Sequence, residues 1–397
     1  MGGEDVGSVN LKRLLPWGIV AAGVALRALM ATSLRIPVNG DLENFLLPWV
    51  DYIRTHGAAG LADEFNNYAP AYIYLLALIA WAGLPEVAAI RLLSALFDYV
   101  CAYFVGRVLR RMGVRVGKGG DPMPWALAFV PLMPTMLINS CYWGQCDSIY
   151  SAFALAAVAF AIEGRPWRAS VALGVAFAFK LQAVFVVPLF FALWLRGRMG
   201  LRHFAVVPLM YVLVALPEIL MGRDPALVMS VYLHQAGTYE QLNMGFCGLF
   251  SIAEAAGLTE GDALKVAGCA AVAVAGVCYG LWLRRRDWDV SLFPLVGLVG
   301  AVAAAWLLPG MHERYLFVGD LLAMACAASS TGVARLAALA VPAASLYCYL
   351  SRSRFESLMP LWPVAIVLAV AAVVLFASLL RRTGKTECET RRDFTAN

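Results

Sequence analysis

The sequence predicts an all-α polytopic membrane protein with about 11–13 transmembrane helices. Of its 397 residues 61% are hydrophobic and 14% are charged, whereas soluble domains carry roughly a quarter charged residues. The mean hydropathy is +0.73. Apolar runs close to the roughly 20 residues of a membrane-spanning helix recur along the chain. The short alternating segments of a membrane β-barrel are not found in the sequence.

The first apolar run, Leu14 to Leu34, is predicted to be a retained helix. It is too long for the core of a signal peptide, it contains Arg27, and it lacks a cleavage site. The nine cysteines are scattered without a Cys-x-x-Cys pair, so neither a zinc site nor a redox motif is indicated.

Charge sets the predicted orientation, because short cytoplasmic loops are rich in Lys and Arg. Lys12 and Arg13 precede the first span, so the N-terminus is placed inside. The next basic cluster, at 107–118, is also inside only if residues 68–84 do not cross. We therefore expect residues 35–86 to form one large outer loop with two amphipathic surface helices.

The apolar stretch from Ala169 to Leu195 is interpreted in the same way. As one long helix it would place Arg196 and Arg202 outside. Two short crossings that meet near Lys180 and Gln182 keep these arginines inside. A broken helix also lets a lysine within an apolar run line a hydrated cavity.

The complete threading places most of the 31 Lys and Arg residues, and both termini, on the cytoplasmic side. The predicted spans are 14–34, 87–106, 122–140, 149–162, 169–180, 182–195, 203–221, 263–283, 289–308, 315–331, 335–350 and 359–380.

Four polar clusters then emerge together on the outer side, which suggests an enzyme at that membrane surface. The clusters are Asp41 with Glu43, Trp143 to Asp147, Lys180 with Gln182, and His312 to Tyr315.

The two aspartates of these clusters each have a structural and a chemical interpretation. Asp41 precedes an apolar stripe at helical spacing, so it can cap a helix, act as a general base, or do both. Asp147 precedes a span and can cap it, and Trp143 can anchor at the interface. Gly144 and Gln145 between them are less expected from anchoring alone.

Lys180 needs a partner or water, because a buried lysine is otherwise costly. Asp98 within the second span is a structural candidate for that partner, although Arg91 is another candidate to pair with Asp98. A contact from Lys180 to a phosphate is the favoured alternative. His312 or Arg314 could neutralise a phosphate leaving group in the same way.

The order of these motifs resembles the GT-C class of integral-membrane glycosyltransferases over residues 11–320. The resemblance rests on the acidic first loop, Tyr68-Ala69-Pro70, Trp-Gly-Gln-x-Asp at 143–147, Phe-Lys-Leu-Gln at 179–182 and His-Glu-Arg-Tyr at 312–315. Within the class, the chain is most similar to prokaryotic relatives of GPI mannosyltransferase II, and it is also similar to dolichyl-phosphate-glucose glucosyltransferases. Two departures are the Asp-x-Glu spacing at 41–43 and Tyr-Ala-Pro in place of Tyr-Pro-Pro.

This resemblance implies an inverting transfer of a sugar, mannose in the first instance, from a polyprenyl-phosphate donor in the membrane. The acceptor is an unidentified glycan, lipid or protein at the extracytoplasmic face of the plasma membrane, and no nucleic acid is involved. Asp41 is expected to be the general base, with Lys180, Gln182, His312 and Arg314 at the donor phosphate, Glu313 and Tyr315 orienting them, and Glu43, Tyr68, Trp143, Gln145, Asp147 and Asn243 at the sugar or acceptor.

No cofactor is expected. Asp41, Glu43 and Asp147 could converge on Mg²⁺ or Mn²⁺, but no spacing demands a metal.

The competing function is a secondary transporter or a translocator of lipid-linked glycans, because intramembrane charges and broken helices mark transport sites too. The chain lacks the internal repeat typical of transporters. We expect a catalytic module at 1–330, further helices at 331–380 and a disordered cytoplasmic tail at 381–397.

Overall fold

The computed structural model describes residues 11–237, 240–352 and 359–385, and it is helical almost throughout. Its strands are only two residues long. β1 (Asn243–Met244) pairs in parallel with β3 (Met311–His312), and β2 (Arg286–Asp287) pairs antiparallel with β4 (Gly384–Lys385). The predicted all-α class is confirmed. Most of the predicted tail, at 386–397, lies outside the described residues.

Among the described residues, seven helical segments are long and apolar enough to cross a membrane, and one bent pair makes an eighth. The bent pair joins α5 (Met123–Phe129) to α6 (Pro134–Leu137) and η3 (Ile138–Tyr142) at 57°. The seven are α1 (Leu11–Thr32), α4 (Glu86–Arg111), α10 with α11 (Leu201–Phe204, Val206–Leu220), α14 (Asp262–Arg284), η5 with α15 (Val290–Leu292, Phe293–Leu307), α17 (Gly332–Ser351) and α18 (Trp362–Arg382).

The remaining predicted spans coincide with shorter apolar helices. These are α7 (Asp147–Ile162), α8 (Pro166–Phe179), η4 with α9 (Leu181–Val186, Val187–Leu195) and α16 (Phe317–Ser329). The predicted break in the 169–195 stretch is confirmed, because Lys180 between α8 and η4 has an extended backbone (φ −159°, ψ 139°). The break takes Lys180 out of the helix.

The loop predicted at 35–86 folds on itself. It contains η1 (Leu42–Leu46), α2 (Leu47–His56), η2 (Gly57–Ala62) and α3 (Pro70–Trp81), which is too short for a full crossing. The apolar stripe that we expected to face the membrane is buried instead in a small core shared with α3. That core includes Leu42, Leu46, Trp49, Ile53, Tyr72, Ile73 and Leu76.

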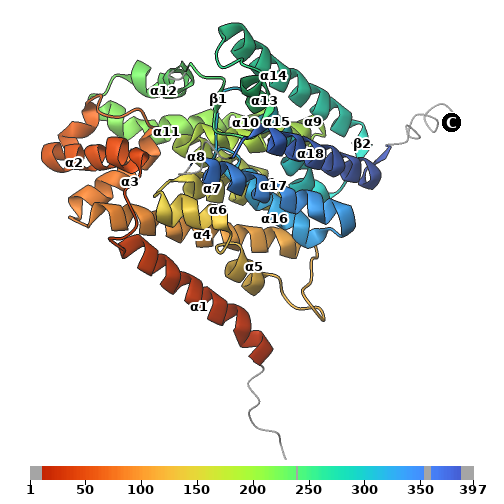
Figure 1. Ribbon diagram of the computed structural model, residues 1–397. Coiled ribbons are helices and arrows are strands. Elements are labelled where there is room, and N and C mark those ends of the chain that lie inside the picture. The colour runs from red at the N-terminus through yellow and green to blue at the C-terminus, as the bar shows by residue number, and fades with distance from the viewer. Residues whose placement is uncertain (1–10, 238–239, 353–358, 386–397) are drawn as a thin grey trace, which may run out of the picture.

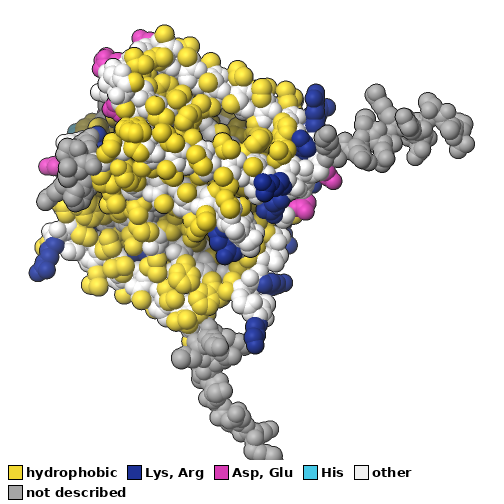
Figure 2. Space-filling model, turned by 45° about the vertical axis from the view of Figure 1, so that its right-hand side comes forward, with side chains coloured by type: hydrophobic (Ala, Val, Ile, Leu, Met, Phe, Trp, Pro, Cys, Tyr) yellow, Lys and Arg dark blue, Asp and Glu magenta, His cyan; other side chains and the backbone are white. Residues whose placement is uncertain are grey.

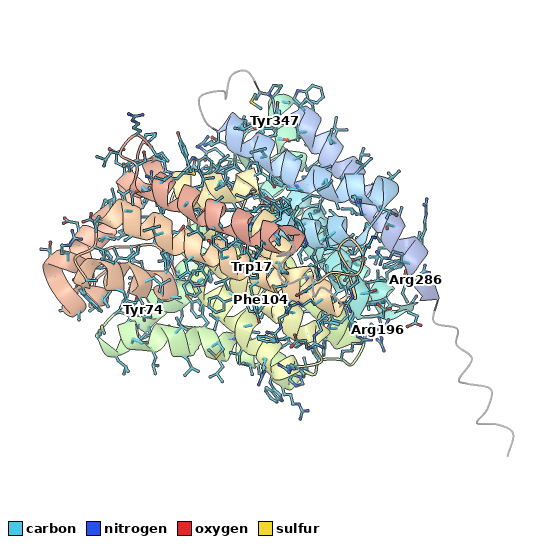
Figure 3. The ribbon with its side chains drawn as sticks, turned by 90° about the horizontal axis from the view of Figure 1, so that it is seen from below. Trp17, Tyr74, Phe104, Arg196, Arg286 and Tyr347 are labelled. Carbon is cyan, nitrogen blue, oxygen red and sulfur yellow. The ribbon has the colours of Figure 1, made fainter. Side chains whose placement is uncertain are left out.

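The two ends of the molecule differ in character. In Figure 1, α2, α3 and α12 (Pro225–Gly237) gather at the left, and β2 lies at the right. Lys and Arg side chains collect along the right-hand edge in Figure 2, beside a broad apolar surface. Figure 3 places Tyr74 of α3 at one end, opposite Arg196 and Arg286. We refer to these as the loop end and the basic end.

A buried ion pair attaches α1 to the bundle. The Arg27 guanidinium lies 3.1 Å from Asp98 of α4, and Ser140 Oγ donates to the same carboxylate at 2.6 Å. The expected pairing of Asp98 with Lys180 or Arg91 is therefore wrong. Arg91 donates instead to the Pro37 and Tyr142 carbonyls. The main core is continuous from α4 to α18.

Candidate active site

A cavity at the loop end brings most of the predicted residues together. Its empty volume is about 770 Å³, part of it open to solvent. The predicted residues in its lining are Asp41, Tyr68, Gln145, Lys180, Gln182, His312, Arg314 and Tyr315, and they are joined by Phe45, Leu46, Asn67, Phe179, Tyr232 and Gln235.

Asp41 points its carboxylate towards the other site residues and does not cap the helix that it opens. Asn39 caps this helix, because its Oδ1 accepts a hydrogen bond from the Leu42 N–H at 2.9 Å. Asp41 makes no capping hydrogen bond. Instead, Asp41 Oδ2 accepts from Gln145 Nε2 at 2.8 Å and lies 3.0 Å from Arg314 Nη2. The side chain of Asp41 remains 38% exposed, so a substrate can reach it.

Gly144 allows Gln145 to approach Asp41. Its φ is +66°, a backbone conformation that residues other than glycine rarely adopt. A Cβ at this position would also lie only 3.1 Å from Leu42 Cδ1. The turn is closed by a hydrogen bond from the Gln145 N–H to the Asn139 carbonyl at 2.8 Å. The glycine of the Trp-Gly-Gln-x-Asp motif thus packs this turn against the residue that follows Asp41.

Asp147 lies beneath the cavity rather than in its lining. Its carboxylate is fully buried and does not cap α7. Its Oδ1 accepts from Lys180 Nζ at 2.5 Å, and its Oδ2 accepts from Asn139 Nδ2 at 2.8 Å. Lys180 has three N–H donors and lines the cavity with 8% of its side chain exposed. Asp147 therefore holds this ammonium in place from behind.

The His-Glu-Arg-Tyr segment is fixed by the short parallel pair of β1 and β3 and by a hydrogen bond from Gly310 N–H to the Leu242 carbonyl. Arg314 then lies among three carboxylates. The distances are 2.6 Å from Nη1 to Glu313 Oε1, 3.0 Å from Nη2 to Asp41 Oδ2, and 3.8 Å from Nε to Asp147 Oδ2.

Burial and these neighbours set the charges of the segment. Burial alone would raise the pKa of Glu313, but Arg314 and His312 outweigh it and lower that pKa to about 2. Burial lowers the pKa of His312 below its ordinary 6.5, although the Glu313 carboxylate, whose Oε2 lies 3.8 Å from His312 Nδ1, acts in the opposite direction. At neutral pH, Lys180 and Arg314 thus supply the positive charge, and His312 is a neutral hydrogen-bonding group.

Three predicted residues lie away from this cavity. Glu43 is exposed on η1, and Trp143 packs its ring 4.8 Å from that of Tyr349. Asn243 lines a different cavity and donates to Glu254 Oε2 at 2.8 Å.

The suggested convergence of Asp41, Glu43 and Asp147 on a metal is not seen. Within the described ranges, no group of three or more His, Cys, Asp or Glu side chains could hold a metal ion.

The sequence did not single out several residues that build the site. Asn139 Nδ2 donates to Tyr349 OH at 2.8 Å as well as to Asp147, so α17 supports the site from behind. Asn139 lies within a predicted span, and a polar residue at such a position is a sequence feature that could have pointed to the site. Tyr232 and Gln235 of α12 also line the cavity, and Gln235 Nε2 donates to the Asn67 carbonyl at 2.6 Å.

Comparison with known proteins gives one clear relationship. No curated protein sequence matches the chain. A similar solved structure is the crystal structure of ArnT from Cupriavidus metallidurans bound to undecaprenyl phosphate. It is 14% identical, the match covers 94% of this chain and 77% of that chain, and the TM-score is 0.48. The model of glycosyltransferase family 87 matches residues 66–288, more than half of the chain. The chain therefore belongs to glycosyltransferase family 87, and it is a multi-pass membrane glycosyltransferase.

Proposed function

We propose that this glycosyltransferase moves a hexose, mannose in the first instance, from a polyprenyl-phosphate donor to an acceptor hydroxyl with inversion at the anomeric carbon. The observation that carries the proposal is the single cavity in which an accessible carboxylate, Asp41, meets two cations, Lys180 and Arg314. Family membership supports the transfer of a sugar and disfavours the transporter alternative. The sequence resemblance to GPI mannosyltransferase II supports the mannose donor, and that finer relationship stays a prediction.

Asp41 is the proposed general base. Its contacts with Gln145 and Arg314 both fall on Oδ2, which leaves Oδ1 to accept the proton of the acceptor hydroxyl. As that proton leaves, the acceptor oxygen attacks the anomeric carbon and the lipid phosphate departs from the opposite face. General-base catalysis of this kind contributes typically about 10²–10⁴-fold to the rate.

Lys180 and Arg314 are the proposed phosphate ligands. Negative charge grows on the departing phosphate, and fixed cations are most effective where charge develops. Both side chains line the cavity, and each has more N–H donors than its carboxylate partners use. Gln182 lines the same cavity, and its buried Oε1, which has no hydrogen-bond partner among the described residues, can accept from a sugar hydroxyl. We propose no cofactor for this step.

The proposed location of the reaction is the extracytoplasmic face of the plasma membrane. The loop end, which holds the cavity, lies opposite the basic end. Because basic residues favour the cytoplasmic side, this arrangement supports cytoplasmic termini and an external active site.

The test is transfer from radiolabelled polyprenyl-phosphate mannose in membranes that contain the natural acceptors. Asp41→Asn should abolish transfer while expression and retention of the donor stay normal. Asp51→Asn is the matched control, because Asp51 is an exposed carboxylate of the same loop outside the cavity lining. Retained turnover in the Asp41 variant would eliminate this residue as the base. Parallel reactions with glucose and arabinose donors identify the preferred sugar.

A further inference from the structure

A further hollow, separate from the active site and from the cavity lined by Asn243, has an apolar lining. It is a groove between α4, α7 and α8 with an empty volume of about 820 Å³. Its exposed lining is entirely apolar, and its lining residues include Phe104, Phe153, Phe160, Val171 and the stem of Arg168. Phe104 lies between Tyr74 of the loop end and Arg196 of the basic end (Figure 3). We call this hollow the α4–α7–α8 groove.

One end of the groove carries a concentration of guanidinium groups. α7 ends at Ile162 and α8 begins at Pro166, so the turn between them closes that end. Within this turn, Glu163 is buried among three arginines. They are Arg107 at 2.6 Å, Arg111 at 3.5 Å and Arg165 at 3.4 Å.

These contacts leave an excess of positive charge. The hydrogen bond with Arg107 and the other two arginines keep the pKa of Glu163 below its ordinary value, so this one carboxylate stays ionised against three guanidinium groups. Arg168 adds a fourth guanidinium, and it has no carboxylate partner among the described residues. Arg107 also lies 5.2 Å above the ring of Phe160, which connects this charge to the groove lining.

An exposed tryptophan marks the level of the membrane interface at this end. Trp167 precedes Arg168, is half exposed, and lies 5.7 Å from the Arg202 guanidinium. Tryptophan is enriched where the hydrocarbon meets the lipid headgroups. The groove therefore runs from the headgroup level of the basic end into the hydrocarbon.

We propose that the α4–α7–α8 groove binds one acyl chain of an anionic phospholipid, with the lipid phosphate held by Arg168 and the neighbouring guanidinium groups. The argument is charge complementarity: an apolar channel ends at surplus arginine, and arginine binds phosphate through several N–H donors in one plane.

The dimensions favour a phospholipid over the polyprenyl donor. From Phe153 to Phe160 along α7 the groove extends by about 10 Å, which is within the roughly 15 Å of one leaflet. The proposed donor phosphate lies at Lys180 and Arg314, beyond the other end of the groove, where Phe153 stacks on Phe179 at 5.6 Å. A lipid anchored at Arg168 has its headgroup in the opposite leaflet.

The experiment uses the full-length protein in phosphatidylcholine vesicles. A trace of photoactivatable phosphatidylglycerol, or of phosphatidylcholine with the same diazirine acyl chain, is added, and cross-linked peptides are mapped by mass spectrometry. We expect several-fold more adduct on α7 and α8 from the anionic probe. Equal labelling of these helices by the two probes would overturn the proposal.

Two variants distinguish the contribution of the Arg168 charge from that of the apolar groove lining. Arg168→Gln should reduce the preference for the anionic probe to near unity, whereas Arg284→Gln should keep it, because Arg284 lies in the last turn of α14 outside the groove lining. Val171→Trp should fill the groove and remove adducts from both probes. Val171 is 41% exposed, so this change leaves the core intact.

Competition with polyprenyl phosphate shows whether the groove binds a phospholipid or the chain of the donor. We expect an excess of polyprenyl phosphate to leave the labelling unchanged. Displacement of the anionic probe would assign the groove to the donor chain instead. An anionic preference that persists in the Arg168 variant, or adducts that persist in the Val171 variant, would place the lipid elsewhere and contradict the proposal.

Discussion

Arg314 shows how the charges of the site depend on one another. It contacts Asp41, Glu313 and Asp147, and Asp147 in turn holds Lys180. With His312 neutral, three carboxylates face two cations, so both cations are held in place before any substrate arrives. Removing one member of such a buried network leaves the others unpaired, which is costly.

The Lys180–Asp147 pair allows catalysis to be separated from stability. Lys180→Met should abolish transfer and also lower the free energy of unfolding by about 3–5 kcal/mol, because Asp147 loses its nearest cation and stays buried with only Asn139 and, at 3.8 Å, Arg314 beside it. Adding Asp147→Asn should restore much of the melting temperature in detergent, since the buried charge is gone, but it should not restore transfer. Recovery of activity in the double variant would refute a catalytic role for Lys180.

His312 should make the protein less stable in mild acid. Because its pKa is lowered in the folded state, His312 takes up a proton in the unfolded chain at a higher pH than in the folded protein. The unfolded state thus binds more protons as the pH falls through 6.5, and stability declines there. Between pH 7.5 and 5.5 the wild-type Tm should fall more than that of His312→Gln. An equal fall in both proteins would contradict a buried neutral imidazole.

At the residue scale, the sequence predicted which charged residues meet at one cavity better than it predicted their contacts. Asp41, Lys180 and Arg314 stand out because charge between apolar runs is expensive. The position of Asp147 behind the cavity was not predicted, because sequence spacing does not show that Asn139 and Lys180 enclose it. Asn243 was included as a polar loop residue, and its own strand directs it towards another cavity.

The turn after η3 is the element on which the position of Asp41 depends. Gly144→Ala should lower transfer at least tenfold, because a Cβ at φ +66° is strained and would press on Leu42 beside Asp41. Gly164→Ala is the matched control: its φ is +68°, no atom lies within 4 Å of an added Cβ, and it lies at the basic end.

Both glycine variants should lose about 1–2 kcal/mol of stability from the left-handed backbone. Only the Gly144 variant should lose transfer, as measured with the radiolabelled donor. Comparable transfer rates in the two variants would show that the Gly144 turn does not position the base.

Elements were predictable where charge constrained them. The break at Lys180 followed from the arginines after α9, and the structure confirms it. The helices α12 and α13 (Leu249–Ala255) and the β1–β3 pair were not predicted, because the loop at 223–262 has no long apolar run. Tyr349 of α17 reaches Asn139, so we propose that the catalytic module extends beyond residue 330.

The orientation of the whole molecule can be tested by cysteine labelling in intact cells. A cysteine at position 67, in the cavity lining, should react with a membrane-impermeant thiol reagent from outside, whereas one at 116, in the basic segment 107–118 that is predicted to be cytoplasmic, should not. The background must lack Cys269 and Cys278, which are exposed on α14, and also Cys388. Labelling at 116 from outside would reverse the threading.

At the scale of the molecule, composition was sufficient for the membrane class, and every predicted span coincides with a helical segment of the structure. The packing within the loop end was not predictable. The stripe of α2 looks the same in sequence whether it faces lipid or protein, and only the position of α3 shows that it faces protein.

The most direct test of the account is a density map of the protein with polyprenyl phosphate in a lipid bilayer. The phosphate should lie in the loop-end cavity within hydrogen-bonding distance of both Lys180 and Arg314, with Asp41 across the space left for the sugar. A phosphate bound away from these two cations, with the cavity empty of lipid, would contradict it.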